Sequence, residues 1–138
     1  MAVKIGKALG TGVTVLSSSE RKRSDAERLS GFDFALTSQS DTFTRLQRRI
    51  DFILDTVSAP HNYNAYVNLL KTDGTMILVE APGRPTLLEP FPMILHRRSI
   101  AVSVVGGIRE TQEMFDFCAT HSIESDIEVI PLQQVNGA

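Results

Sequence analysis

The sequence is poor in the residue types that stabilise secreted and metal-rich proteins. Its 138 residues include one cysteine and no tryptophan. One cysteine excludes an intrachain disulfide framework and a cysteine-rich zinc site, so a reducing cytoplasm is the expected location. No apolar run comes near the roughly 20 residues of a membrane span, and the first residues have no apolar signal core. We therefore expect one domain over residues 1–138 with no membrane partner.

An excess of charge of one sign is absent as well. Sixteen acidic and 14 basic side chains leave a net charge of −2, which argues against general binding to polyanions. The basic pairs at 48–49 and 97–98 are far apart and have no aromatic residues between them, so we expect no nucleic-acid partner. The three histidines, His61, His96 and His121, are scattered along the chain and no cluster of cysteines accompanies them, so no metal site is expected.

A regular alternation of short apolar strands and helices runs along the chain. Strands are predicted at 13–16, 34–37, 52–57, 76–79, 100–105 and 127–130. Helices are predicted at 3–9, after an N-cap at Ser19, and at 41–49, 63–70 and 109–121. A turn is predicted at 73–74, and an irregular proline-rich loop at 81–92. The alternation predicts an α/β fold in three layers, with helices on both faces of a mostly parallel sheet.

A serine-rich and basic segment follows the first predicted strand. Ser17, Ser18 and Ser19 come directly after its apolar residues, and Lys22 lies three positions further on. In nucleotide-binding α/β domains an acid at the tip of the second strand binds a ribose 2′-hydroxyl, whereas a basic residue accommodates a 2′-phosphate. Hydroxyls with a cation therefore indicate an NADP phosphate site. A helix N-cap followed by a solvated basic turn explains the same residues and stays open as an alternative.

Two acids, Asp51 just before the third predicted strand and Asp55 within it, could suggest a catalytic pair of carboxylates. Asp51 and Asp55 are four residues apart, which on a strand separates them by ~13 Å. That distance is too large for two carboxylates to act on one bond. We interpret Asp51 as an acid at the start of the strand and Asp55 as an acid that lines a site.

Five segments along the chain resemble a known family. They are, in order, AVKIGKALG, VTVLSSSERKR, DFILDTVSAPH, LLKTDGTMILV and RRSIAVSVVGGIRETQEMFDFC. In this order and spacing they resemble the zinc-dependent, medium-chain alcohol dehydrogenases, in the cinnamyl-alcohol-dehydrogenase-like, NADP-preferring branch. The resemblance implies an oxidoreductase family, a Rossmann domain and NADP(H) as the cofactor. The family's reaction moves a hydride between the nicotinamide and an alcohol or aldehyde carbon.

The resemblance also implies a set of cofactor contacts at the ends of strands. Ser17, Ser18 and Lys22 would hold the 2′-phosphate, with Ser19 or Arg21 assisting. The segment near the ribose and pyrophosphate would comprise Asp55, Thr56 and Val57. The residues along the nicotinamide side would be Val79, Ser103, Val104 and Val105. Strand ends are where open α/β sheets bind ligands.

The resemblance covers the cofactor-binding domain, and that domain is incomplete. The family's first strand and its glycine-rich phosphate loop have no counterpart, and Glu80 and Val102 stand where members usually have glycine. Zinc belongs to the family's catalytic domain, which is absent, so we assign no catalytic residue and expect the chain to be inactive alone. The alternative function is that of a truncated, non-catalytic remnant that acts as an α/β oligomerisation or interaction module.

The missing strand would lie in the middle of the sheet. Its two neighbours could pair directly across the gap, a second copy could fill the gap, or the chain could be only marginally folded. Unpaired strand edges are templates for another chain, so we expect a homodimer or a higher homo-oligomer.

Overall fold

The computed structural model describes residues 1–30, 33–80, 82–127 and 129–137. The strands are β1 (Val15–Ser17), β2 (Phe34–Leu36), β3 (Ile50–Asp55), β4 (Leu70–Leu78) and β5 (Ser99–Val102). The α-helices are α1 (Ala2–Ala8), α2 (Arg23–Ser30), α3 (Thr42–Leu46), α4 (Tyr63–Val67), α5 (Pro90–His96) and α6 (Ile108–Thr120). Two 3₁₀ helices complete the described elements, η1 (Glu20–Lys22) and η2 (Leu132–Gly137).

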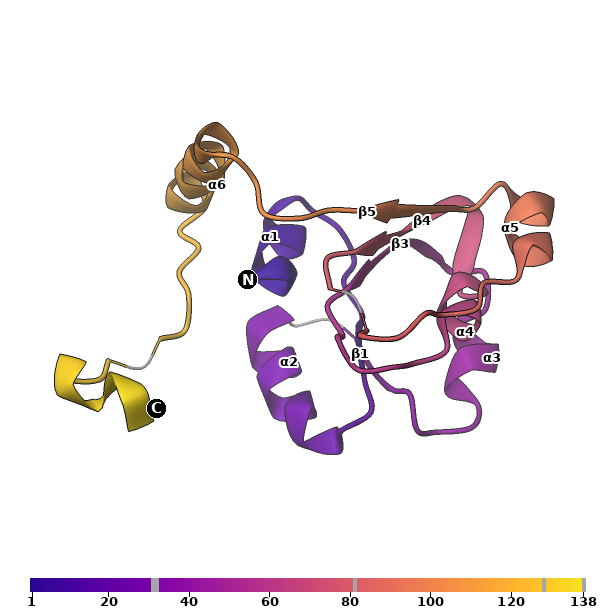
Figure 1. The fold of residues 1–138 in the computed structure, drawn as a ribbon, viewed down its shortest axis with the longest axis horizontal. Helices are drawn as coiled ribbons and strands as arrows, with labels where there is room; N and C mark the ends of the chain where they lie inside the picture. The colour runs from indigo at the N-terminus through magenta and orange to yellow at the C-terminus, as the bar shows by residue number, and fades with distance from the viewer. Residues whose placement is uncertain (31–32, 81, 128, 138) are drawn as a thin grey trace.

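The strands form two parallel sheets instead of one. β1 pairs with β2, and β3, β4 and β5 pair in that order. Within the described residues β1 pairs only with β2 and β3 only with β4, so the edge of β1 and the edge of β3 are both left open. Figure 1 shows where the strands lie. Direct pairing across the gap, one of the three alternatives considered above, is therefore wrong. Parallel strands joined through helices confirm the predicted α/β class.

The core lies between the three-stranded sheet and α4. Its buried cluster comprises Ile53, Tyr63, Val67, Leu69, Leu70 and Met76. Phe43 and Leu46 on α3 pack against this cluster, as does Leu16 of β1. Leu16 thus ties the two sheets through side-chain packing. Apolar side chains from both sheets share one core although their backbones are not paired.

Two helices end earlier than the sequence predicts, because the chain pairs with the sheet instead. α3 stops at Leu46 where the backbone of Gln47 becomes extended. α4 stops at Val67, and Leu69 accepts hydrogen bonds from the backbones of Arg49 and Ile50. Strand pairing between β3 and the start of β4 therefore overrides the local preference for helix over 68–70.

The turn predicted at 73–74 lies inside β4 as a bulge. Ile50 pairs with Leu70, but Phe52 pairs with Thr75, so β4 carries extra residues at this point. Asp73 accommodates them with a positive φ of 63°. The local turn chemistry was right, but its place between two elements was wrong, since pairing resumes on both sides of it.

The proline-rich loop ends sooner than predicted. Pro90 begins α5 at a position where a missing N–H is harmless, because the first helical N–H groups have no partner within the helix. The helix runs to His96 and ends at Arg97, which adopts the left-handed conformation. The prediction of a loop over 81–92 is therefore wrong at its C-terminal end, where residues 90–92 belong to α5. Residue 81 lies outside the described residues.

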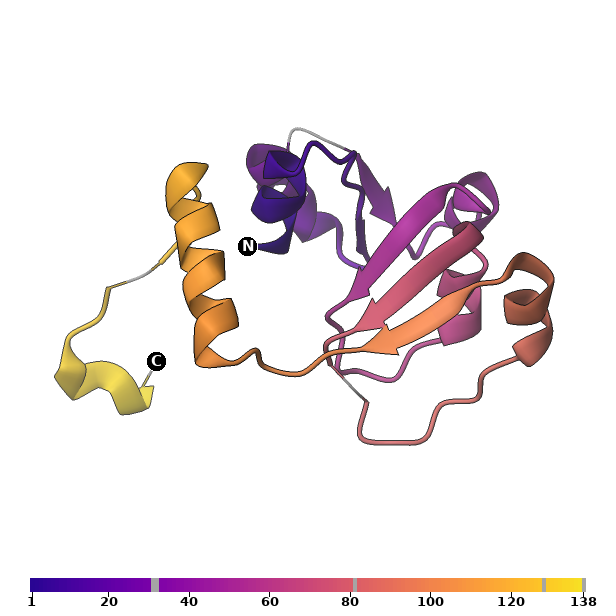
Figure 2. The ribbon, with the colours of Figure 1, turned by 90° about the horizontal axis from the view of Figure 1, so that it is seen from above.

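The strands predicted for the last third of the chain are shorter or unformed. β5 ends at Val102, so the predicted strand residues 103–105 lie beyond its end. Residues 127, 129 and 130 are not in a strand, since none of the described strands pairs with them. α6 forms as predicted and lies beside α1 and α2, away from the three-stranded sheet (Figure 2).

Candidate functional site: the carboxyl edge of the sheets

The three parallel strands β3, β4 and β5 end in register. Asp55 pairs with Leu78, and Leu78 pairs with Val102. The backbone then continues the ladder for one step: the N–H of Val79 donates to the carbonyl of Asp55 at 3.1 Å, and the N–H of Ser103 donates to the carbonyl of Leu78 at 3.0 Å. The predicted site residues that follow these strands therefore lie side by side along one edge.

The other sheet presents its own carboxyl edge at the serine-rich segment. The Oγ of Ser17 accepts a hydrogen bond from the N–H of Ser19 at 3.1 Å, which folds the chain back after β1. Ser19 precedes η1 but its side chain makes no capping hydrogen bond, so the expected N-cap role is not filled by its hydroxyl. Ser18 and Lys22 are exposed. The hydroxyl of Ser18 and the ammonium group of Lys22 are thus both open to solvent.

One acid in the segment is neutralised by its own neighbour. The guanidinium of Arg23 makes an ion pair with Glu20, which lowers the pKa of that carboxyl, and lies 4.6 Å from the ring centre of Phe34. Arg21 and Lys22 have no ion pair among the described residues. Of the three basic residues in the segment, two are therefore left to face an anion.

A tyrosine links the two edges. Tyr66 of α4 shares a side-chain hydrogen bond with Thr37, which directly follows β2. Burial raises the pKa of Tyr66, the hydrogen bond to Thr37 lowers it, and the charge of Asp55 raises it further. Tyr66 thus lies within electrostatic reach of the end of β3 while it contacts the end of β2. The ends of both sheets therefore meet on one side of the domain.

Asp55 is the buried acid of this edge. The residue is 7% exposed. Its Oδ1 accepts a hydrogen bond from the N–H of Val57 at 3.1 Å, and its Oδ2 lies 3.1 Å from Nε2 of His61. That second contact is at ion-pair distance but lacks standard hydrogen-bond geometry, since Oδ2 has no hydrogen-bond partner within the described structure. Asp55 thus faces inward, toward the chain that follows it.

His61 is a member of the site that the sequence analysis missed. Nothing in the sequence connects it with Asp55, because their contact depends on the path of the chain over 56–60. The ring of His61 packs edge-on against Tyr63 and Tyr66, with ring centres 4.6 and 5.4 Å away. The available signal was the position of Tyr63 and Tyr66, which lie on a predicted helix and follow His61 within five residues.

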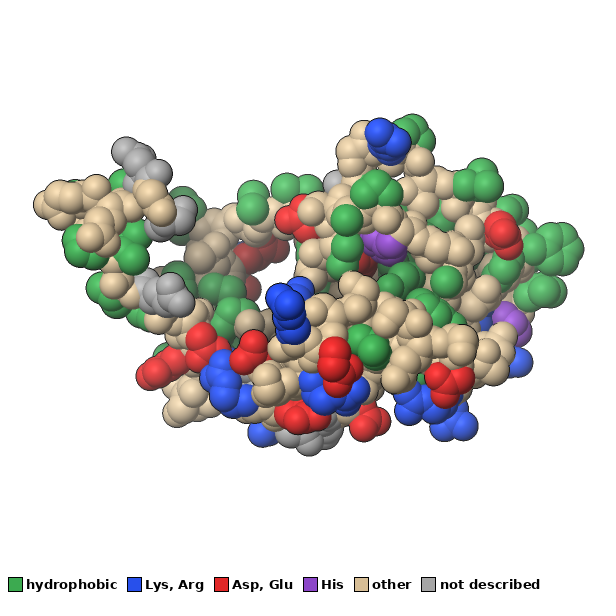
Figure 3. Space-filling view, turned by 90° about the horizontal axis from the view of Figure 1, so that it is seen from below, with side chains coloured by type: hydrophobic (Ala, Val, Ile, Leu, Met, Phe, Trp, Pro, Cys, Tyr) green, Lys and Arg blue, Asp and Glu red, His purple; other side chains and the backbone are tan. Residues whose placement is uncertain are grey.

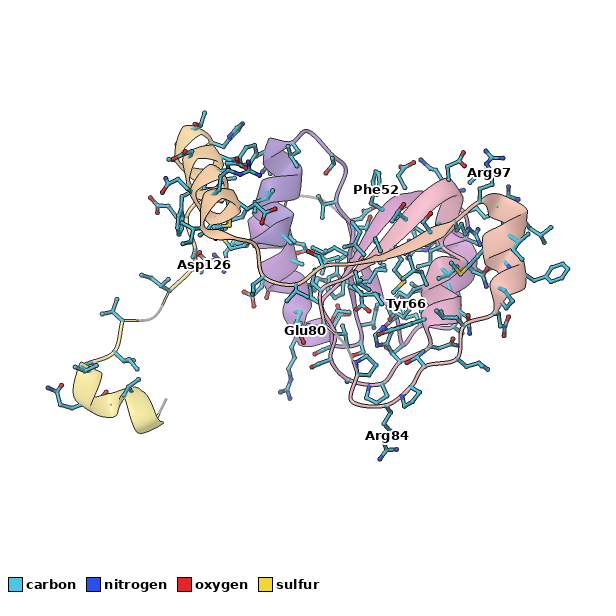
Figure 4. All side chains as sticks on the ribbon, turned by 45° about the horizontal axis from the view of Figure 1, so that its top comes forward. Phe52, Tyr66, Glu80, Arg84, Arg97 and Asp126 are labelled. Atoms are coloured by element: carbon cyan, nitrogen blue, oxygen red, sulfur yellow. The ribbon has the colours of Figure 1, made fainter. Side chains whose placement is uncertain are left out.

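Apolar side chains lie open along the same edge. Val57 and Val79 are 47% and 40% exposed, and Val104 and Val105 are almost fully exposed. Thr56 and Ser103 are exposed beside them. Figure 4 shows Glu80 at this end of β4, at the opposite end of the strand from Arg97. The edge therefore offers apolar surface for a ring, but it also carries the carboxylate of Glu80.

The described residues contain neither a cluster of metal ligands nor a membrane-spanning helix. No three histidine, cysteine or acidic side chains gather there as a cation would require. No helix within the described ranges is long and apolar enough to cross a bilayer.

A family model described as zinc-binding dehydrogenase matches residues 1–120. The chain belongs to this family. It is 48% identical over 138 residues to a probable formaldehyde dehydrogenase of Bacillus subtilis and 44% identical to an NADP-dependent alcohol dehydrogenase of Mycolicibacterium smegmatis. The match covers all of this chain and 40% of each relative, so the chain spans well under half of their length.

Solved structures of zinc-binding dehydrogenases share the fold. A cinnamyl alcohol dehydrogenase of Sorghum bicolor is 38% identical with a TM-score of 0.93, over 99% of this chain and 39% of that one. A Helicobacter pylori enzyme, solved with NADP(H), is 33% identical with a TM-score of 0.84, over all of this chain and 39% of that one. These matches confirm the Rossmann-like α/β fold and the resemblance to the cinnamyl-alcohol-dehydrogenase-like branch.

Proposed function

We propose that this chain is an NADP(H)-binding domain of the alcohol dehydrogenase type, and that it has no turnover by itself. The 2′-phosphate would lie on Ser17, Ser18, Ser19 and Lys22. The ribose and pyrophosphate would lie along Asp55, Thr56 and Val57. The nicotinamide side would comprise Val79, Ser103, Val104 and Val105. When bound, NADP(H) supplies the hydride chemistry, whereas the chain binds and orients it.

The turn after β1 is the observation that carries this proposal. It combines the exposed Ser18 and the half-buried Ser17 and Ser19 with Lys22 and Arg21, and the acid within this turn, Glu20, is held by Arg23. A dianionic phosphate needs such donors, and a free carboxylate at this point would repel it. The H. pylori relative solved with NADP(H) supports the same cofactor.

The ends of β3 and β4 support the ring-binding part of the proposal. Val57 and Val79 expose apolar surface next to backbone groups that hold the ladder in register. Flat apolar surface with few polar groups is typical of the pockets in which aromatic ligands bind. Glu80 is a local obstacle, because its carboxylate lies at the same edge as the pyrophosphate path.

A thermal-unfolding series with NADPH and NADH tests the proposal. At about 100 times its dissociation constant, a ligand adds about 2.7 kcal/mol to the free energy of unfolding. We expect NADPH to raise the melting temperature well above the shift with NADH. Lys22→Ala should abolish that difference, because the 2′-phosphate is the only group that distinguishes the two ligands.

Lys7→Ala is the matched control for the lysine substitution. Lys7 is an exposed lysine in the last turn of α1, and it contributes the same charge without belonging to the serine-rich turn. An equal loss of NADPH preference in both variants would show general charge attraction instead of a phosphate site. A cooperative melt that neither nucleotide shifts would favour the non-catalytic module.

The open edge of β5 supports a homodimer as the assembly. Among the described strands β5 pairs only with β4, and apolar side chains are exposed next to that edge. They are Val102, Val104 and Val105 in and after β5, and Phe91, Ile94 and Leu95 on α5. Figure 3 shows hydrophobic side chains at the end of the molecule where α5 lies. Two copies related by a two-fold axis would pair these edges and cover this apolar surface.

Light scattering at micromolar concentration tests the assembly. We expect the mass of a dimer for the unmodified chain and of a monomer for Val104→Asp, which places a charge in the covered surface. Val135→Asp, at a half-exposed position in η2, should leave the dimer intact. A monomer before substitution contradicts the proposed assembly.

A further inference from the structure

Each nitrogen of the His61 ring has an oxygen atom close to it. Its Nδ1 lies 2.9 Å from the carbonyl oxygen of Ala59. A carbonyl oxygen can only accept, so Nδ1 must carry a hydrogen. Nε2 lies 3.1 Å from Oδ2 of Asp55. A neutral ring carries one N–H group, which here donates to the carbonyl of Ala59. Nε2 would then present a lone pair to the carboxylate of Asp55.

The doubly protonated ring resolves this conflict. An imidazolium donates from both nitrogens, so it satisfies the carbonyl of Ala59 and forms an ion pair with Asp55. Asp55 needs a positive charge beside it, because its Oδ2 is buried and has no hydrogen-bond partner in the described structure. A buried carboxylate without a compensating charge is costly. No lysine or arginine comes within ion-pair distance of Asp55 in the described part of the chain.

The other titratable groups that face His61 are two tyrosines of α4. Burial, followed by the charge of Asp55, raises the pKa of Tyr63. Burial is also the main cause that raises the pKa of Tyr66. Both phenols therefore stay neutral in the physiological range, and their rings favour a cation beside them. Among the groups that face one another here, His61 alone supplies a positive charge for Asp55.

The same carboxylate sets the chain that follows β3. Oδ1 of Asp55 accepts the N–H of Val57, while Oδ2 faces His61 at the other end of the β3–α4 loop. We propose that His61 is a positioning residue: its imidazolium holds Asp55, and through Asp55 it holds Thr56 and Val57 in the arrangement that binds the nucleotide. Nucleotide affinity then weakens when the positive charge of His61 is removed. This inference rests on the proposed NADP(H) site.

The test compares the unmodified chain with His61→Gln between about pH 5.5 and 8.5, the range in which histidine changes charge. Two quantities are measured at each pH: the melting temperature without ligand and the dissociation constant for NADP⁺. The ratio of dissociation constants between the two proteins cancels the titration of the ligand's own phosphate. We expect the variant to bind about tenfold more weakly at the acidic end. The ratio should approach one at the alkaline end.

Two further variants make the result specific. Asp55→Asn places an amide N–H opposite Nε2, which suits a neutral ring, so its binding should lose the pH dependence that the unmodified chain has. His121→Gln is the matched control, because Nδ1 of His121 also lies 2.9 Å from a carbonyl, that of Phe117. No carboxylate lies within ion-pair distance of His121 in the described structure, so this variant should behave as the unmodified chain.

The two measurements separate the inference from the proposed function. A melting difference that shrinks with rising pH, in a protein that binds no NADP⁺ at any pH, would confirm the His61–Asp55 pair and reject the cofactor site. NADP⁺ binding with a ratio that is flat across the pH range overturns the positioning role. A His121 variant that follows the His61 variant overturns it as well.

Discussion

The β3–β4–β5 sheet and the segment 103–137 are formed by different kinds of interaction. The sheet joins residues that are far apart in sequence, and its cluster with α4 contains fully buried side chains such as Leu70 and Met76. In segment 103–137, Cys118 is the only buried side chain among those described. α6 therefore exists through local helix signals, whereas the sheet exists through packing. Local signals suffice to form a helix, but they do not fix where the helix lies.

The sharpest way to break the comparison is one substitution made in both regions. Leu70→Ala removes a side chain with 0% exposure from the cluster, so we expect a loss of about 2–5 kcal/mol in the free energy of unfolding. Leu132→Ala makes the same change at a position that is 81% exposed, where we expect a change within about 0.5 kcal/mol. Urea denaturation measures both. Equal losses would mean that the tail packs in solution.

The bulge in β4 gives a second test with glycine. A Cβ on Gly74 would lie 3.0 Å from the Cβ of Leu70 and 3.1 Å from two backbone oxygens. Gly74→Ala should therefore lower the free energy of unfolding by about 1–3 kcal/mol. Gly12→Ala is the control, since nothing lies within 4 Å of a Cβ there. A neutral Gly74→Ala would show that the bulge can open.

The start of α6 tests the local half of the comparison. Oε2 of Glu110 accepts a hydrogen bond from the N–H of Gly107 at 2.7 Å, which is half of a capping box. Glu110→Ala should destabilise this helix by about 0.5–1 kcal/mol. Amide hydrogen exchange should then speed up in α6 but not in β4. Glu113→Ala removes an acid one turn later, where it only pairs loosely with Arg109, and should have less effect.

The smallest expected effect belongs to an exposed ion pair beside the bulge. Two hydrogen bonds of 2.7 Å from Arg97 lower the pKa of Asp73. A lowered pKa means that the pair stabilises the fold above the ordinary aspartate pKa of about 3.9. That contribution is lost as pH falls through the lower folded value. The stability difference between the unmodified chain and Asp73→Asn should therefore shrink on acidification, and also in high salt.

The order and type of most elements could be predicted from the sequence, because their signals are local. The apolar stretches at Val15–Ser17 and Phe34–Leu36 and the periodic stretch of α6 give elements close to the predicted ones. The predictions fail where pairing with a neighbouring strand decides whether a segment becomes a strand. Leu70 joins β4 because Ile50 of β3 pairs with it, whereas residues 68–69 form a turn, and residues 127 and 129–130 pair with no strand in the described structure.

The site was predictable in part for the same reason. Parallel strands end on one side, so Asp55, Val79 and Ser103 were expected together, and the in-register ends of β3, β4 and β5 bring them together. Their roles toward a cofactor stay predictions. The contact of His61 with Asp55 lay beyond the sequence, because it depends on the path of a loop without periodicity.

The absence of backbone pairing between β1 and β3 has a consequence for cooperativity. A continuous sheet unfolds as one unit, but here the two sheets communicate through side chains such as Leu16. A dinucleotide with its phosphate on the turn after β1 and its rings along the ends of β3 to β5 would touch both sheets. Its binding energy would then couple two units that are only weakly coupled without it. The ligand would be expected to sharpen the unfolding transition as well as to raise its midpoint.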